Sequence, residues 1–175
     1  MRLVPRQLAL LRGVNVGGNK RVEMARLREL MAELGYRDVR TYVNSGNVVF
    51  TGPSRSEQQL ETAIAKTFGF EVPVVLRSRD ELADIVQANP LREVANDAAK
   101  YLVVFCGAEA ATNLDPKDFA PETFRVRGRE IYLWAPGGIG TSELAKRLAT
   151  KPLGAKSTAR NWRTVEKLLA LADEV

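Results

Sequence analysis

The chain has 175 residues, 45% of them hydrophobic and 27% charged, which is typical of an ordered protein with one large or two small domains. It contains no histidine and a single cysteine, Cys106, so the commonest general base and the commonest ligands of zinc, copper and iron are missing. Serine–histidine and cysteine–histidine mechanisms are therefore excluded, and the sequence indicates no transition-metal site and no cofactor.

The net charge of +5 is unevenly distributed along the chain. Residues 1–50 carry 9 Lys and Arg against 4 Asp and Glu, residues 51–140 carry 10 against 13, and residues 141–175 carry 7 against 4. If the two basic ends meet in space, they form one positive surface that attracts phosphates or nucleic acid. Scattered, solvated cations are the alternative. No apolar run of about 18 residues and no export signal is seen, so we expect a cytoplasmic protein without a membrane segment.

The first 76 residues predict the element order β-α-β-β-α-β. Apolar and β-branched runs predict strands at Gln7–Leu11, Val39–Val43, Val48–Phe50 and Val72–Leu76. Helical spacing predicts one helix from Met24 to Leu34, ended by Gly35, and another after the capping-box pattern Ser54-x-x-Glu57. This order is that of the ferredoxin-like fold, a four-stranded sheet with both helices on one face.

Residues 77–175 predict a second, smaller α+β unit. A capping box at Ser78-x-x-Glu81 begins a helix, a strand follows at Tyr101–Phe105, and Thr123–Val126 with Glu130–Trp134 predict a hairpin. A short helix and a longer final helix come next, the last with Thr158 as its N-cap. We expect an α+β protein with a ferredoxin-like domain at 1–76 and a subdomain at 77–175 whose C-terminal helix packs back on the first. A divergent duplication is one origin that we consider for the two halves.

The first polar motif is Arg12-Gly-Val-Asn-Val-Gly-Gly-Asn-Lys20, which follows a strand and precedes a helix. In that context exposed amides and a helix N-terminus bind anions. The motif is not a P-loop, because Gly18 is followed by Asn19 instead of Lys, and it lacks the dinucleotide spacing G-x-G-x-x-G. A turn that brings Arg12, Asn15 and Lys20 close to a phosphate or carboxylate is one interpretation, and a tight β-to-α connection is the other.

Two further motifs are polar. Asn44-Ser-Gly-Asn47 offers amides and a hydroxyl that suit base edges, sugars or peptides, although the same residue types also favour turns. The segment from Lys156 to Arg163 places cations in the first turn of the last helix, where the helix dipole is positive. An anionic partner would explain them, and salt bridges to the acidic middle of the chain are the alternative.

These motifs carry a family resemblance. The runs Ala9-Leu-Leu-Arg-Gly-Val-Asn-Val-Gly-Gly18, Met24-x-x-Leu27-x-x-Leu30 and Asn44-Ser-Gly-Asn-Val-Val-Phe50, followed by Thr158-x-Arg-Asn-Trp162, resemble the signature of the domain of unknown function 1697 family. The resemblance implies a small, mostly bacterial α+β protein with ferredoxin-like halves and no assigned biochemistry. It places the family's polar signature residues on the three motifs and on Trp162.

We therefore predict that the protein binds an anionic ligand, a nucleotide or nucleic acid, at a loop site between the halves where the three motifs meet. The first alternative is an enzyme that acts on a phosphorylated or carboxylated substrate, with Lys20 or a carboxylate such as Glu23 moving the proton. The second is a purely structural polar cluster. No catalytic residue and no oligomeric state are assigned. The predicted ligand-binding residues are Arg12, Asn15, Gly17, Gly18, Lys20, Asn44, Ser45, Asn47, Thr158, Arg160, Asn161 and Arg163.

Overall fold

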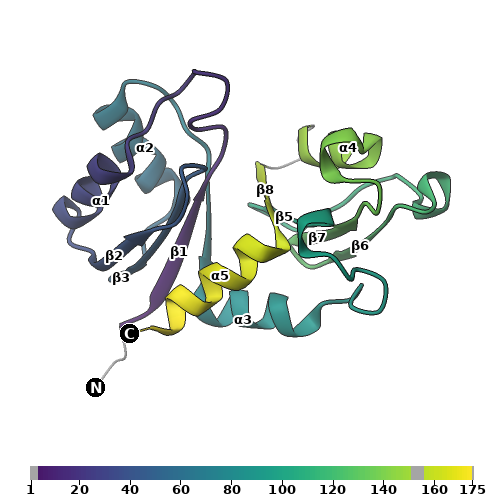
Figure 1. Cartoon of the computed structure of the whole chain (residues 1–175). Coiled ribbons are helices and arrows are strands. Elements are labelled where there is room, and N and C mark those ends of the chain that lie inside the picture. Colours follow the sequence, from purple (N-terminus) through teal and green to yellow (C-terminus); the bar gives the residue numbers. More distant parts are fainter. Residues whose placement is uncertain (1–3, 151–155, 175) are drawn as a thin grey trace. The chain divides into compact units, whose positions relative to one another are not determined.

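The protein forms two compact units, each built on one antiparallel sheet (Figure 1). The structure is a computed structural model that describes residues 4–150 and 156–174. One unit comprises Met1–Ala83 with Leu168–Val175, and the other comprises Asp84–Lys167. The described residues contain two four-stranded sheets and five α-helices, which confirms the predicted α+β class. The domain boundary at 76/77 stays a prediction.

The first unit has the predicted element order. Its sheet has the strand order β2-β3-β1-β4, and every neighbouring pair of strands is antiparallel. The name ferredoxin-like stays a prediction for this arrangement. The elements are β1 (Arg6–Leu11), α1 (Met24–Glu33), β2 (Arg37–Thr41), β3 (Asn47–Thr51), α2 (Glu57–Phe68) and β4 (Val74–Ser78).

Both helices of the first unit cover the same face of its sheet (Figure 1). Alternate strand residues share one face of a sheet, and here these residues are apolar and buried. They form one core with α1 and α2, which contribute Leu27, Leu30, Met31, Leu60 and Ile64. The apolar stripe at helical spacing thus fixes α1 on the sheet, and its N-terminus lies at the end of the loop that follows β1.

The start of α2 corrects one prediction. Ser56, not Ser54, is the N-cap, and it forms a capping box with Gln59: Gln59 N donates to Ser56 Oγ at 3.1 Å, and Ser56 N donates to Gln59 Oε1 at 2.9 Å. Either serine fits the sequence pattern. With Ser56 at the cap, the Glu57 carboxylate accepts a hydrogen bond from Leu76 N of β4 at 2.8 Å instead of forming the predicted box. The second predicted box, Ser78 with Glu81, is present at the start of α3 (Arg79–Ala88).

The second sheet repeats the strand order of the first. Its order is β6-β7-β5-β8, again antiparallel throughout, so β5 to β8 correspond to β1 to β4. In the place of α1 stands η2, a 3-10 helix of only four residues. The duplication of one unit stays a prediction. The remaining elements are η1 (Ala98–Lys100), β5 (Tyr101–Cys106), η2 (Pro116–Phe119), β6 (Thr123–Arg127), β7 (Glu130–Trp134), η3 (Ile139–Thr141), α4 (Glu143–Thr150), β8 (Ser157–Asn161) and α5 (Trp162–Asp173).

The segment before the last helix is a strand, which corrects the prediction that Thr158 is the N-cap of that helix. Ser157–Asn161 forms β8 and pairs with the buried strand β5. Asn161 is the residue at the cap, since its Oδ1 accepts a hydrogen bond from Thr164 N at 2.9 Å. Tertiary pairing with β5 therefore overrides the helix signal of the hydroxyl-rich run, as context often does for short segments.

One face of the second sheet carries a buried aromatic cluster. The rings of Tyr101 and Trp162 stack with their centroids 4.8 Å apart. The Tyr132 hydroxyl donates to Ile85 O at 2.8 Å, and the Tyr101 hydroxyl bonds Asn89 Oδ1 at 2.8 Å. Burial raises the pKa of Tyr132 to about 12 and raises that of Tyr101 well above its ordinary value. Both phenols are therefore neutral at physiological pH.

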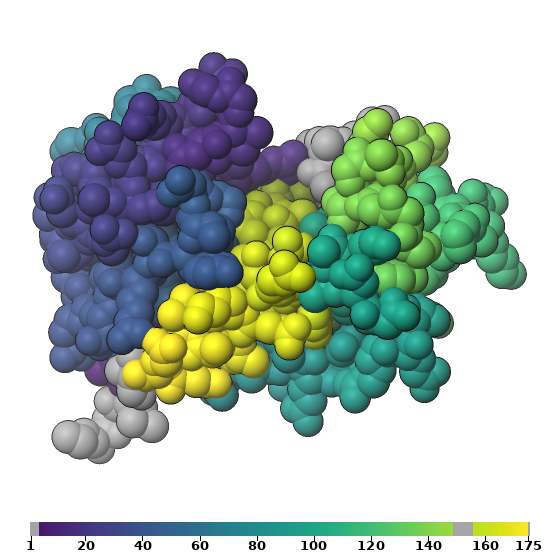
Figure 2. Space-filling view, in the orientation of Figure 1, coloured from purple at the N-terminus to yellow at the C-terminus, as the bar shows by residue number. Residues whose placement is uncertain are grey.

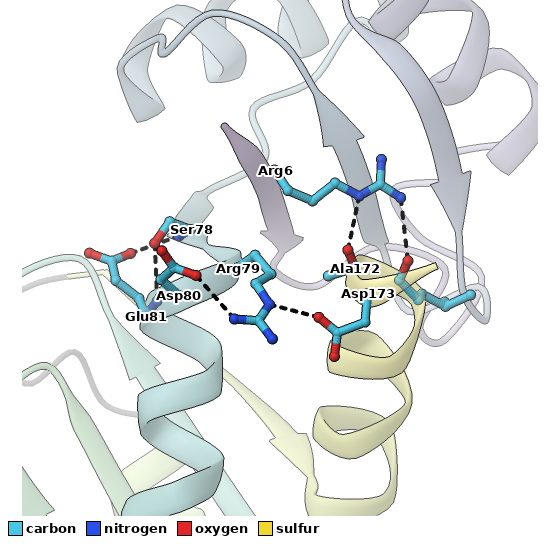
Figure 3. Close-up of polar contacts among 8 residues, drawn as sticks. Arg6, Ser78, Arg79, Asp80, Glu81, Ala172 and Asp173 are labelled. Atoms are coloured by element: carbon cyan, nitrogen blue, oxygen red, sulfur yellow. Dashed lines mark hydrogen bonds and ion pairs between the residues drawn. The ribbon is translucent and has the colours of Figure 1, made fainter. Parts of the chain in front are cut away.

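The last turn of α5 belongs to the first unit (Figure 3). Arg6 of β1 donates from Nε to Ala172 O and from Nη2 to Leu171 O, both at 3.3 Å, so it adds hydrogen bonds to carbonyls of the last helical turn. Arg79, at the start of α3, donates from Nε to Asp173 Oδ1 at 2.7 Å. Residues that are far apart in the sequence thus complete the first unit.

Candidate functional site

The glycine loop between β1 and α1 is a tight, exposed turn. Asn19 N donates to Val16 O at 3.2 Å, and the two residues between them, Gly17 and Gly18, have φ of 62° and 78°. Positive φ at both central positions favours glycine, because a side chain is strained there. In Figure 2 the atoms of this loop, in purple, stand out at the top of the first unit. The turn therefore presents backbone groups and polar side chains to solvent.

Asn15 braces this loop from within. Its Oδ1 accepts a hydrogen bond from Val22 N at 2.9 Å, and its Nδ2 donates to Val22 O at 2.9 Å and to Asn44 O at 2.6 Å. Both ends of the amide are thus engaged with the backbone. The first and second polar motifs meet through this side chain, which ties the glycine loop to the hairpin turn.

The hairpin turn between β2 and β3 is also closed by its own residues. Asn47 is fully buried, and its Nδ2 donates to Tyr42 O at 2.8 Å and to Ser45 Oγ at 3.0 Å. Gly46 has φ of 88°, and a Cβ there would lie 2.7 Å from Leu11 Cβ, so glycine is required. Asn44 and Ser45 are exposed. The buried half of this motif supports the turn, and the exposed half faces solvent.

A pocket of about 570 Å³ lies where the two motifs meet the start of α1. The glycine loop, the helix and Asn44 together make its wall. The N-cap residue of α1, Glu23, makes no side-chain cap, and the first turn contains no acidic residue. The lining residues are Asn15, Gly18, Asn19, Arg21, Val22, Glu23, Met24, Ala25 and Asn44.

The structure brings together only part of the predicted set. Asn15, Gly18 and Asn44 line the pocket, whereas Arg12, Gly17, Ser45 and Asn47 are not among its lining residues. Lys20 donates from Nζ to Glu71 O at 2.9 Å. Asn19 and Arg21 line the pocket but were missing from the prediction. The start of the helix at Met24 was the available signal, because residues just before a helix surround its N-terminus.

The third segment belongs to the second unit. Arg160 is 7% exposed in β8, and its Nη1 donates to Thr158 Oγ1 at 2.7 Å and to Ala159 O at 2.9 Å. Burial lowers the pKa of Arg160 to about 10, which leaves it charged at neutral pH. Arg163 is exposed in the first turn of α5, after the Asn161 cap. Thr158 and Arg160 thus hold interior positions, and Arg163 faces solvent.

The described residues show neither a metal cluster nor a membrane-spanning helix. Within residues 4–150 and 156–174, no group of three or more His, Cys, Asp and Glu side chains is arranged to hold a metal ion. No helix in that part of the chain is both long and apolar enough to cross a bilayer.

Comparison with known proteins gives the family. Residues 4–132 match the model of the protein family of unknown function DUF1697. The chain belongs to this family. The match includes both motifs at the pocket, while the segment from Thr158 lies beyond it. No curated protein matches the chain significantly.

A solved structure shares the fold of this DUF1697 protein. It is the conserved bacterial protein SP0830 from Streptococcus pneumoniae, with a TM-score of 0.70 and 24% sequence identity. The alignment covers 98% of this chain and all of that one. The likeness supports the α+β architecture over both units.

Proposed function

We propose that this DUF1697 protein binds an anionic ligand, a nucleotide or nucleic acid, in the pocket at the start of α1. The observation that carries the proposal is the combination of an uncapped helix N-terminus with Arg21 in the pocket wall. A phosphate or carboxylate would accept hydrogen bonds from the backbone N–H groups of the helix, and the positive charge of Arg21 would attract it.

The backbone of α1 supports an anion. The first N–H groups of a helix have no acceptor within it, and in α1 no side chain supplies one. Met24 and Ala25, the first two residues of the helix, line the pocket. The dipole adds a partial positive charge at the same end. These groups favour a negative ligand without any movement of the loop.

Arg21 supplies a positive charge at the pocket. It is exposed and forms no hydrogen bond or ion pair with any other described residue. The neighbouring cation Lys20 is held by Glu71 O, so Arg21 is the loop cation at the pocket. Glu23 also lines the pocket, and its carboxylate opposes a bound anion. Binding is therefore expected to depend on Arg21.

Several contacts also support the alternative that the polar motifs are purely structural. Asn15, Gly46 and Asn47 are engaged in holding the two loops, so these positions do not require a ligand to explain them. The residues that separate the two readings are the exposed ones, Arg21 and Asn44. The experiment is accordingly designed on Arg21.

The test is a thermal-shift titration with inorganic phosphate, AMP, ribose 5-phosphate and a single-stranded oligonucleotide. A ligand that binds only the folded chain at about 100 times its Kd raises Tm by about 5–10 °C. Arg21→Ala is expected to abolish the rise, whereas Arg37→Ala, which removes another exposed cation, on β2 and outside the pocket, keeps it.

Two results would contradict the proposal. One is the absence of any shift with all four ligands. The other is a shift that Arg21→Ala and Arg37→Ala reduce equally, because that would indicate general attraction of anions to a basic protein.

A further inference from the structure

The outer strands of the first sheet are protected against pairing with another chain. On β4, the outward N–H groups of Val74 and Leu76 donate to the carboxylates of Glu61 at 3.1 Å and Glu57 at 2.8 Å. On β2, Asp38 has φ of 52° and the ladder with β3 is interrupted between Arg37 and Arg40. Capped groups and irregular ladders are devices by which proteins blunt sheet edges.

The outer strand β6 of the second sheet has neither device. It pairs with β7 at five consecutive positions, from Thr123 opposite Trp134 to Arg127 opposite Glu130, without a bulge. In an antiparallel ladder every second residue turns its N–H and C=O away from the partner strand. Among the described residues no group hydrogen-bonds to the outer edge of β6. Arg125, Val126 and Arg127 are exposed.

The side chains of this edge alternate in character. Arg125 and Arg127 lie on one face of the sheet, and Val126, 43% exposed, lies on the other. Beside Arg125 is a groove of about 380 Å³ that residues 88–94 line, and it brings Arg92 and the exposed Val94 close to the edge. Residues 123–129 contain three arginines and no acidic residue, while Glu130 lies opposite Arg127 in the ladder and Glu93 lines the groove. The edge is thus regular and exposed, and β6 itself contributes only arginines to one of its faces.

We propose that β6 is a docking edge for an extended acidic segment of a partner protein, which adds a strand to the second sheet. Backbone hydrogen bonds supply the general affinity in this mode, and alternate side chains supply the specificity. Carboxylates of the segment lie beside Arg125 and Arg127, and its apolar side chains lie on the face of Val126. Opposite charges on neighbouring strands stabilise such a pair.

A second copy of this chain is a poorer occupant of the same edge. Antiparallel pairing of β6 with itself would place Arg125 and Arg127 of one copy among the same arginines of the other. Like charges on facing strands are destabilising. The charge pattern therefore selects an acidic segment over self-association, and this surface is independent of the pocket at α1.

The probe is a fluorescent peptide Val-Glu-Val-Glu-Val-Glu-Thr, and binding is measured by anisotropy at low salt. Saturable binding to the native chain is expected. Arg125→Glu is expected to weaken it about tenfold or more, since it reverses a charge at the interface. The matched control is Arg37→Glu on β2, an exposed edge-strand arginine on the protected sheet, and it is expected to leave the affinity within about twofold.

Two further arms identify the mode of binding. A peptide with N-methyl groups at alternate positions keeps its charges but loses backbone donors, so it is expected not to bind. A peptide with Lys in place of Glu is expected to bind Arg125→Glu better than it binds the native chain. The proposal is overturned by no saturable binding of the Glu peptide, by equal binding of the N-methylated peptide, or by a native dimer in sedimentation that Arg125→Glu converts to monomer.

Discussion

The two sheets share a strand order but differ in the connection from the first strand to the second. In the first unit β1 leads through the glycine loop into α1, and the pocket lies at that connection. In the second unit β5 leads through η2, which is too short to present a helix N-terminus of the same kind. The comparison teaches that apolar alternation sets the sheet, whereas the connection after the first strand decides whether a pocket forms at a helix start.

The hairpin turns sharpen this comparison and give the largest expected effect. Gly46 and Gly128 both have positive φ, but a Cβ at Gly46 would overlap Leu11, whereas a Cβ at Gly128 meets nothing within 4 Å. Gly46→Ala is expected to lower the free energy of unfolding by about 3 kcal/mol, from strain plus overpacking. Gly128→Ala is expected to lower it by about 1 kcal/mol, from strain alone.

Urea denaturation followed by circular dichroism measures both changes. An equal decrease in the free energy of unfolding for the two variants would show that the β2–β3 turn relaxes to accept the new Cβ. The predicted difference between the two hairpins would then be wrong.

The next effect comes from a buried tyrosine of the second unit. Because burial raises the pKa of Tyr132 to about 12, the folded chain keeps this proton above pH 10, where an unfolded tyrosine loses it. The folded state then binds more protons than the unfolded state, so stability is full below about pH 10 and falls as pH rises toward 12. Urea unfolding from pH 8 to 11.5 checks this, with the fluorescence of Trp134 and Trp162 reporting on the second unit.

The Tyr132→Phe variant is the control for the alkaline experiment. It removes one of the titrating groups and should make the fall shallower. An unchanged slope would assign the alkaline loss to other residues.

The smallest effect compares two buried hydroxyls, one in each unit. The Tyr132 hydroxyl donates to Ile85 O, whereas the buried Tyr36 hydroxyl has no hydrogen-bond partner among the described residues. Tyr132→Phe is expected to lower the free energy of unfolding by about 1 kcal/mol, because it removes a buried hydrogen bond to a carbonyl that keeps only its longer bond from Asn89 N. Tyr36→Phe is expected to leave the free energy of unfolding unchanged or to raise it slightly, since the buried hydroxyl it removes has lost its hydration and gained no hydrogen bond. The melting temperature of Tyr132→Phe should therefore fall below that of Tyr36→Phe. A larger fall for Tyr36→Phe would refute the assignment of the hydrogen-bonded hydroxyl to Tyr132.

Most of the fold could be predicted because its signals are local. The hairpin at Thr123–Arg127 and Glu130–Trp134 follows from β-branched and aromatic runs around a glycine, and α1 follows from its apolar stripe. The strand β8 was missed because it contains Ser157, Ala159 and Arg160, and it is a strand only through pairing with β5. Non-local pairing leaves little trace in a short polar segment.

The meeting of two of the three polar motifs could be predicted for the same reason, whereas their binding of a ligand stays a prediction. The meeting of the glycine loop with the hairpin turn was expected, and the Asn15 side chain makes that contact. The role of each polar residue was not readable, because Asn15 and Asn47 are equally suited to a ligand and to a backbone carbonyl. Arg21 was overlooked, since its place in the pocket depends on where α1 begins.

The hydrogen bonds of Arg6 and Arg79 to the last turn of α5 also bear on how the chain folds during its synthesis. Arg6 and Arg79 form hydrogen bonds with residues 171–173 (Figure 3). These residues leave the ribosome only after all of residues 84–167. Domains usually fold as they emerge, beginning with the N-terminal one. Here the unit that begins first is completed last, so the nascent chain holds a first unit without the end of α5 while the second unit is being made.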